Sequence, residues 1–187
     1  MSDQPYQSLI NVLLEQQQAQ SKLPPVARWN PPLSGDIDIH ITSDGTWYHQ
    51  NSAIQRQSLV KLFSTVLKRE ENDYFLVTPV EKWRIKVDDA PFIAVALDVH
   101  DKGSSSQALV FHCNTGDRII ASAFHPIRVK VRPQTGEPSP YILVRDNLEA
   151  KINRSVFYHL VELAEQSHDP DSTFYGVLSQ GHFFRLE

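Results

Sequence analysis

The sequence predicts an α+β fold made of two similar strand-strand-helix-strand-strand units, an internal duplication to which further antiparallel strands are added. Period-two alternation of apolar and polar residues marks strands in both halves, and each half carries one amphipathic helical stripe. The halves also align by letter: Ile54-Gln55-Arg56 matches Ile152-Asn153-Arg154, and Trp83-Arg84-Ile85 matches Phe184-Arg185-Leu186. Generic patterns can align by accident, but the paired Ile-x-Arg at the start of both helices favours duplication.

The N-terminal segment, residues 6–20, is predicted to be an amphipathic helix. Its apolar face is formed by Leu9, Ile10, Leu13 and Leu14. Prolines at positions 24 and 25 forbid continuation of this helix, which we expect to dock on the rest of the chain or on a partner protein. A stiff, proline-rich connector anchored by Trp29 follows. We therefore divide the chain into an N-terminal helix (1–22), an N-terminal α+β unit (23–90) and a β-rich C-terminal α+β unit (91–187).

The N-terminal unit begins with a predicted hairpin over residues 36–48. Ile37, Ile39 and Ile41 alternate with polar residues, and Asp44-Gly45 supplies the turn. The elements expected after it are a helix over 54–69 and strands over 74–78 and 82–87.

The C-terminal unit is predicted to be mostly strands. Those expected before its helix cover residues 92–100, 108–112, 118–123, 127–131, 141–144 and 148–152. A helix over 154–166 and a last hairpin over 173–178 and 182–186 complete it.

Composition excludes several classes of protein. Of the 187 residues, 41% are hydrophobic and 21% charged, as in globular domains. A single cysteine, Cys113, excludes an internal disulfide and makes a cysteine-based zinc site untenable. The net charge of −4 disfavours nucleic acid as a partner. No membrane span and no secretory signal is visible, so we expect a cytoplasmic protein with no membrane partner.

Several short motifs occur together in a characteristic order. They are Trp29-Asn30-Pro31-Pro32, Gly35-Asp36-Ile37-Asp38, Asp44-Gly45-Thr46-Trp47-Tyr48, Leu76-Val77-Thr78-Pro79-Val80-Glu81-Lys82, Asp89-Ala90-Pro91-Phe92 and Gly176-x-x-Ser179-x-Gly181-x-Phe183-Phe184. Over the whole chain after the first helix, this order resembles the uncharacterised bacterial family called domain of unknown function 1285. The resemblance implies a duplicated α+β fold with a second half superficially like a pleckstrin-homology domain. It also implies a ligand site between the halves, a nucleotide-like ligand and a role in signal transduction, with no catalytic motif and no cofactor.

Arg56 and Arg154 stand at the predicted starts of the two helices. Unpaired N–H groups there favour phosphate or carboxylate, and arginine can add two parallel hydrogen bonds to such an anion. The alternative is a surface arginine paired with a nearby acid, which contributes about 0–1 kcal/mol. Trp29, in the stiff connector, is the tryptophan best placed to stack on a purine, although burial is the commoner fate of that side chain.

Two basic stripes follow strands. Their members are Lys82, Arg84 and Lys86 in the first half and Arg128, Lys130 and Arg132 in the second. Alternation sends all three charges of a stripe to one face, where they could line an anion-binding groove. A solvated face or a protected sheet edge is the more common arrangement. Of the six, we retain Lys82 as a candidate ligand contact.

Asp36, Asp38 and His40 also share one strand face. Neighbours of this kind lie about 6–7 Å apart, close enough for two of them to bind a hard metal ion. The polar side of a half-buried strand is the alternative.

No motif in the sequence names a reaction, so three hypotheses are carried forward. The first is a non-enzymatic module that binds an anionic small molecule, such as a nucleotide, between the halves through Trp29, Arg56, Lys82 and Arg154. The second is a metal-assisted hydrolase that uses Asp36, Asp38 and His40. The third is an adaptor in which the N-terminal helix and the pleckstrin-like second half dock a protein partner.

Overall fold

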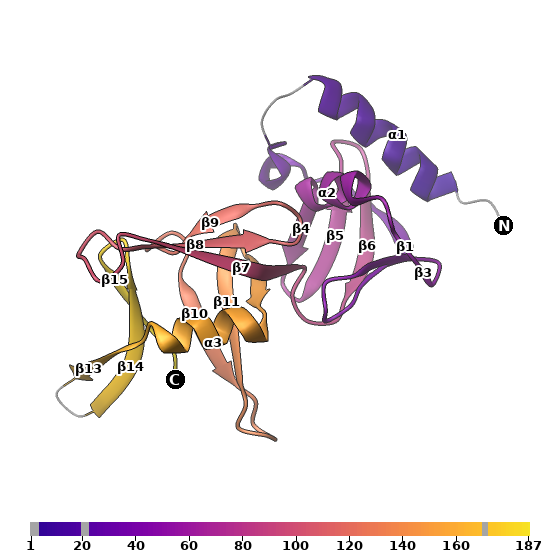
Figure 1. The fold of residues 1–187 in the computed structure, drawn as a ribbon. Coiled ribbons are helices and arrows are strands. Elements are labelled where there is room, and N and C mark those ends of the chain that lie inside the picture. The colour runs from indigo at the N-terminus through magenta and orange to yellow at the C-terminus, as the bar shows by residue number, and fades with distance from the viewer. Residues whose placement is uncertain (1–3, 20–22, 170–171) are drawn as a thin grey trace. The chain divides into compact units, whose positions relative to one another are not determined.

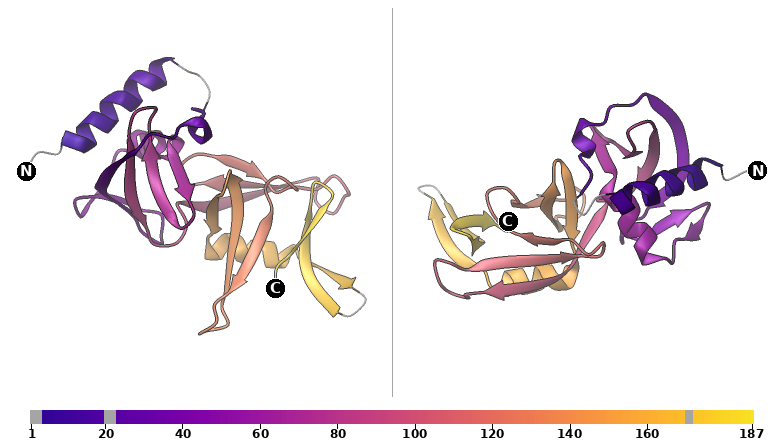
Figure 2. Two further views of the ribbon diagram at one scale, coloured as in Figure 1. Left: turned by 180° about the vertical axis from the view of Figure 1, so that it is seen from behind. Right: turned by 90° about the horizontal axis from the view of Figure 1, so that it is seen from above.

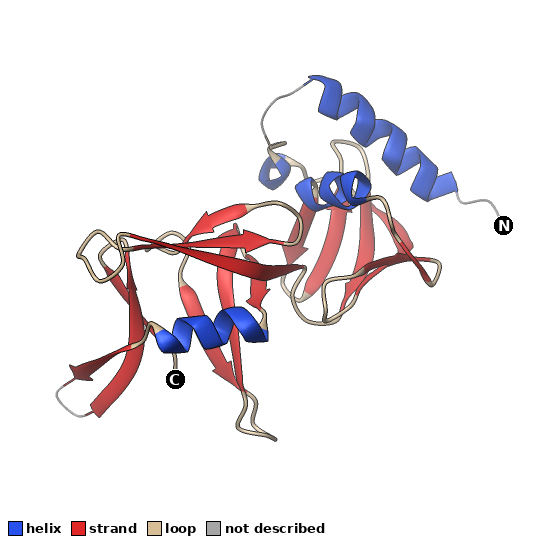
Figure 3. Ribbon diagram, viewed as in Figure 1, coloured by secondary structure: helices blue, strands red, loops and turns tan. Residues whose placement is uncertain are grey.

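A computed structural model describes residues 4–19, 23–169 and 172–187 (Figure 1). The chain divides into two compact units, Met1–Asp89 and Ala90–Glu187, and each is described by itself. Strands dominate both units (Figure 3). Over the described ranges, no helix is long and apolar enough to cross a membrane. The N-terminal helix α1 covers Gln4–Ala19; Gln20, the last residue predicted for it, lies outside the described residues.

The N-terminal unit is built on a six-stranded sheet. Its strands are β1 (Leu33–Ile41), β2 (Trp47–His49), β3 (Ser52–Ala53), β4 (Leu67–Glu70), β5 (Asp73–Val77) and β6 (Lys82–Val87). They lie in the order β3-β2-β1-β6-β5-β4, with β1 and β6 parallel and the other neighbours antiparallel. The predicted hairpin is confirmed, because Ile41 pairs with Trp47 and Gly45 has the positive φ, 83°, that its turn requires.

One face of this sheet is covered by the helix α2, Gln57–Thr65, and by α1 (Figure 1). The Trp47 ring lies 6.2 Å from that of Phe63 on α2. Leu9 and Leu13 of α1 are fully buried. A short 3-10 helix, Val26–Arg28, lies between α1 and β1. The N-terminal helix therefore docks on its own unit, the first of the two arrangements expected for it.

The C-terminal unit holds two further sheets. The larger contains β7 (Phe92–His100), β8 (Ala108–Cys113), β9 (Arg118–Ile120), β10 (Ile127–Val131), β11 (Pro138–Arg145) and β12 (Leu148–Ile152), in the order β10-β11-β12-β7-β8-β9. After the helix α3, Arg154–Glu162, a smaller sheet contains β13 (Glu165–Asp169), β14 (Ser172–Ser179) and β15 (His182–Arg185) (Figure 2).

The two units share one order of elements, which confirms the duplication. In each, three antiparallel strands precede a nine-residue helix, and three more strands follow it. β1 pairs with β6 in the first unit, and β10 contacts β15 in the second. The strands β7, β8 and β9 are additions that extend the second sheet beyond β12.

Both predicted central helices are too long in the sequence analysis. The helix expected over 54–69 ends at Thr65, and β4 follows it; the helix expected over 154–166 ends at Glu162, and β13 follows. In each case the segment predicted as the end of the helix is instead a strand, β4 or β13, which pairs with β5 or β14. Strand pairing outweighs the helical apolar spacing there, and the β-branched Thr65 and Val66 lower the helix propensity at the first boundary.

A candidate ligand pocket on the N-terminal sheet

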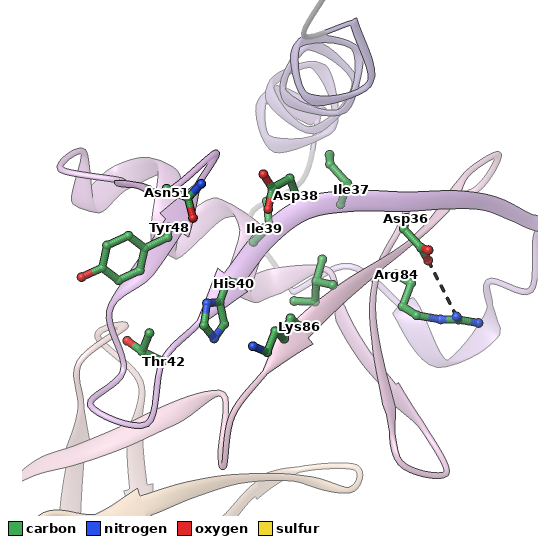
Figure 4. A pocket seen from close by; sticks show the side chains of 11 residues that line it. Asp36, Ile37, Asp38, Ile39, His40, Thr42, Tyr48, Asn51, Arg84 and Lys86 are labelled. Carbon is green, nitrogen blue, oxygen red and sulfur yellow. Dashed lines mark ion pairs between the residues drawn. The ribbon is translucent and has the colours of Figure 1, made fainter.

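An irregularity in the pairing of β1 with β6 creates a pocket on the face of the sheet opposite α2. Asp36 pairs with Arg84 and His40 with Lys86, so four steps along β1 match only two along β6. The extra residues of β1 bulge, and bulges of this kind redirect side chains and are frequent next to functional sites. The resulting pocket has a volume of about 650 Å³ (Figure 4).

Two cross-strand rows of side chains frame this β1–β6 pocket. Tyr48, His40 and Lys86 are neighbours on β2, β1 and β6. Asp36 and Arg84 are neighbours on β1 and β6 and form the second row. Asp38 and Asn51, which lie near each other, also line the pocket (Figure 4).

The cations of the pocket are held loosely. Lys86 Nζ lies 3.7 Å from Asp88 Oδ1, which also lies 2.8 Å from His40 Nε2. Arg84 approaches Asp36 at 3.8 Å and Asp73 at 4.0 Å. These two distances exceed a hydrogen bond. Arg84 Nε is buried and has no hydrogen-bond partner within the described residues. A buried donor of this kind costs free energy until a partner reaches it.

The β1–β2 turn is fixed beside the pocket by one carboxylate. Thr42, which lines the pocket, donates its hydroxyl to Asp44 Oδ1 at 2.5 Å, and the backbone N–H of Thr46 donates to the same oxygen at 3.0 Å. These hydrogen bonds, the hydroxyl's first, hold the pKa of Asp44 below its ordinary value. The turn is therefore ordered by its own side chains.

The three residues considered for metal binding do lie on one face, but they do not converge. Asp36 and His40 are four residues apart along β1 and pair with different residues of β6, Arg84 and Lys86. Asp36 faces Arg84, and His40 bonds to Asp88. Within residues 4–19, 23–169 and 172–187, no three His, Cys, Asp or Glu side chains are placed to hold a metal ion.

Trp29 and Lys82 are linked through Lys68 and Glu70, and neither residue lines the pocket. Lys68 Nζ donates to the carbonyl of Trp29 at 2.9 Å and lies 3.2 Å from Glu70, which also accepts from Lys82 Nζ at 2.9 Å. The hydrogen bond from Lys82 holds the pKa of Glu70 below its ordinary value. The Lys82 ammonium also lies 5.0 Å from the centre of the Phe75 ring.

Arg56 and Arg154 lie at the helix starts, as predicted. Arg56 is the exposed N-cap residue of α2 and makes no capping hydrogen bond with its side chain. Arg154 is the first residue of α3, where the cap is Asn153, and its Nε donates to the hydroxyl of Tyr158 at 2.8 Å. The two arginines belong to different units, so their role as a joint anion site stays a prediction.

The second basic stripe is largely neutralised. Arg128 forms a two-pronged ion pair with Glu149, and Arg132 lies 3.6 Å from Glu137. The Lys130 ammonium lies 5.6 Å from the centre of the Tyr141 ring. These contacts agree with the reading of this stripe as a polar sheet face.

Two family models cover the chain. "Domain of unknown function (DUF1285), N-terminal domain" matches residues 24–90, and "Protein of unknown function (DUF1285), C-terminal domain" matches residues 91–186. The chain belongs to the DUF1285 family.

Two solved structures are similar to this DUF1285 protein. A DUF1285 family protein from Silicibacter pomeroyi DSS-3 is 47% identical, covers 93% of each chain and superposes with a TM-score of 0.82. A DUF1285 family protein from Shewanella baltica OS155 is 25% identical, with a TM-score of 0.52 over 68% of this chain and 92% of the other. No curated protein matches.

The cysteine of this DUF1285 protein lies in the core of its C-terminal unit. Burial raises the pKa of Cys113 to about 12, so the thiol stays protonated and unreactive near neutral pH. Cys113 is a packing residue rather than a nucleophile.

Several residues that line the β1–β6 pocket were not among the predicted site residues. Tyr48, Asn51 and Lys86 belong to this group. The basic stripe on β6 was the one signal in the sequence that pointed toward Lys86 and Arg84. The amino-acid sequence does not indicate the bulge, because the alternation of Ile37, Ile39 and Ile41 continues through it unchanged.

Proposed function

We propose that this protein is a non-enzymatic binding module whose N-terminal unit holds an anionic small molecule, a nucleoside phosphate, in the β1–β6 pocket. The observation that carries the proposal is the wall formed by β6. There Arg84 presents a buried Nε with no hydrogen-bond partner in the described structure, and Lys86 presents a side chain that is 70% exposed.

The phosphate belongs with these two cations. Residues two apart on a strand lie about 6–7 Å apart on one face, a spacing that lets Arg84 and Lys86 contact one phosphate group from two sides. Guanidinium groups bind phosphate through paired N–H donors, and ammonium groups act as point charges. The carboxylate partners at 3.7–3.8 Å are loose enough to be outcompeted.

The nucleoside belongs with the other lining residues. Tyr48 offers a ring face for stacking on a base, and Asp38 and Asn51 offer acceptors and donors for hydroxyls or a base edge. Within the described residues, these three side chains make no hydrogen bond of their own. Their free polar atoms and the two cations together match a ligand with an anionic end and a polar aromatic end.

The candidates from the sequence extend this proposal. Lys82 lies on the same face of β6 as Arg84, two residues earlier, and Trp29 is linked to it through Glu70 and Lys68. A module that binds a nucleotide without transforming it fits a role in bacterial signal transduction. Arg56 and Arg154 remain predicted contacts for an anion.

The test is thermal unfolding of the whole chain with nucleoside mono- and diphosphates, sugar phosphates, inorganic phosphate and divalent metals. A ligand at 100 times its Kd adds about 2.7 kcal/mol, which raises the Tm of a chain this size by roughly 5–10 °C. We expect that shift with a nucleotide, its loss in Arg84→Ala and its retention in Lys102→Ala, which removes an exposed cation of the other unit. An equal shift in both variants contradicts the proposal.

A further inference from the structure

Among the residues that the structure describes, no strand pairs with the outer side of the edge strand β9. Cys113 donates its N–H to the carbonyl of Asp117 at 2.8 Å, and Ala121 donates to that of Leu109 at 2.9 Å, so the odd-numbered residues of this segment bond to β8. In an antiparallel ladder alternate residues point their N–H and C=O to opposite sides. The backbone groups of Arg118 and Ile120 therefore point away from β8, on the last strand of the sheet.

A pocket of about 570 Å³ lies along this edge. It is bounded by β9, by the tight turn over 122–125 and by the turn between β14 and β15. Phe124, at the tip of the first turn, is 85% exposed, and Ile120 is 46% exposed. The turn is closed by reciprocal hydrogen bonds between Ser122 and His125, so Phe124 is held out by ordered backbone.

The lining of this β9 pocket contains one fixed cation, Arg118, and no Asp or Glu; its other titratable side chains are His125 and His182. Asp98 of β7, outside the lining, is near enough to Arg118 to interact with it electrostatically. An acidic group brought to this edge meets Arg118 and no carboxylate from the lining itself.

We propose that β9 is a docking edge at which an extended, acidic and apolar segment of a partner protein adds as a strand. The backbone of that segment bonds to Arg118 and Ile120, its apolar side chains cover Ile120 and Phe124, and its carboxylates face Arg118 and His182. Strand addition takes affinity from the main chain and specificity from side-chain pockets. A second copy of this chain fits less well, because it would bring the same basic groups of both copies to one interface.

Fluorescence anisotropy with labelled peptides tests this proposal. The probe is a peptide of alternating valine and glutamate. Two control peptides are compared with it: a valine–lysine peptide, and a valine–glutamate peptide that is methylated on alternate backbone nitrogens. The lysine and methylated peptides are expected to bind at least tenfold more weakly than the probe. Equal binding of all three peptides overturns the proposal. So does the absence of binding of the probe at about 1 mM, a concentration at which even a weak interface would be detected.

Two variants of the whole chain complete the experiment. Ile120→Pro removes an outward N–H without touching the ladder to β8, and Arg118→Glu reverses the charge at the edge. Each is expected to weaken binding of the probe at least tenfold with an unchanged Tm, whereas Lys102→Glu leaves binding intact. A concentration-dependent dimer in sedimentation that Ile120→Pro abolishes would assign the edge to a second copy and contradict the proposal. These variants leave the β1–β6 pocket untouched, so the outcome is independent of nucleotide binding.

Discussion

At the scale of single residues, the hydroxyl of Ser179 joins the C-terminal hairpin to the larger sheet of its unit. It accepts from the N–H of Leu109 at 3.0 Å and donates to the carbonyl of Ala121 at 2.7 Å, and the side chain is fully buried. The hydroxyl thus bridges the N–H of Leu109 and the carbonyl of Ala121, which would bond directly to each other in a regular antiparallel ladder.

Replacing Ser179 by alanine leaves one buried N–H and one buried C=O without that hydroxyl. An unsatisfied buried backbone group costs about 1–3 kcal/mol, so the Ser179→Ala variant is expected to lose at least that much free energy of unfolding. Urea denaturation measures the loss, with the exposed Ser105→Ala as the matched control. Equal stability of the two variants would show that the bridge is dispensable.

Gly176 on β14 is required by close packing rather than by its backbone conformation. A Cβ atom there would lie 2.3 Å from Phe183 Cε1 and 2.4 Å from the carbonyl oxygen of Phe184. The oxygen belongs to the paired strand β15 and cannot move away without breaking that pairing. The Gly176→Ala variant is therefore expected to lose about 1–3 kcal/mol or more.

Gly103→Ala is the comparison for this effect. A Cβ at Gly103 meets no atom within 4 Å, so that variant suffers only from its positive φ of 76°. Thermal unfolding should place the Tm of Gly176→Ala below that of Gly103→Ala. The reverse order would mean that β15 moves away from the added Cβ atom at little cost in free energy.

At the scale of elements, the strands β4 and β6 are linked across β5 by Glu70. Its carboxylate lies between the ammonium groups of Lys68 and Lys82. The hydrogen bond from Lys82 lowers the pKa of Glu70 from its ordinary value near 4.5. The stabilisation is therefore present above the pKa of the unfolded chain and is lost as the pH falls through the lower pKa of the folded state.

The Glu70→Gln variant makes this pH dependence visible. Because the group is partly exposed, the variant is expected to lose less than about 1 kcal/mol at pH 7. The difference from the unmodified protein should shrink as the pH is lowered from 7 through the lowered pKa of Glu70, because the carboxylate then becomes protonated. Urea titrations at a series of falling pH values, with the exposed Glu162→Gln of α3 as control, measure it. A difference that does not change with pH would assign the effect to packing.

Element positions could be predicted where one local signal decides them. The alternation of Ile37, Ile39 and Ile41 placed β1 and its faces correctly, and Asp44-Gly45 placed the turn. The ends of α2 and α3 could not be predicted, because pairing with β5 and β14 decides them. The pocket was missed for a related reason: a bulge is a mismatch between two strands, and one strand's letters do not record it.

At the scale of the whole molecule, the duplication is the feature that the sequence predicted best. The Ile-x-Arg pair lies at the start of both central helices, and the elements that follow match one for one. The match of both halves to DUF1285 models agrees with that repeat. The ligand contacts named from the sequence stay predictions: Trp29 and Lys82 are linked only through Lys68 and Glu70, and the pocket is lined by Arg84 and Lys86.

The N-terminal helix provides a test that separates packing from adaptor function. Leu9 and Leu13 are fully buried, and the ring of Tyr6 stacks on His49 at 3.7 Å. Deleting residues 1–22 is therefore expected to lower the stability of the first unit by at least about 2 kcal/mol. Thermal unfolding measures the loss. An unchanged Tm would instead favour α1 as a recruiting element for a partner.

The most direct test of the central claim is a titration of the ¹⁵N-labelled whole chain with adenosine monophosphate, adenosine diphosphate and inorganic phosphate. Nucleotide binding in the β1–β6 pocket predicts saturable shifts of amide signals that cluster at Asp38, His40, Asn51, Arg84 and Lys86. It also predicts that Arg84→Ala abolishes these shifts and that Lys102→Ala retains them. Saturable shifts that cluster elsewhere, or no shift at millimolar nucleotide, would contradict the assignment of this pocket as the binding site.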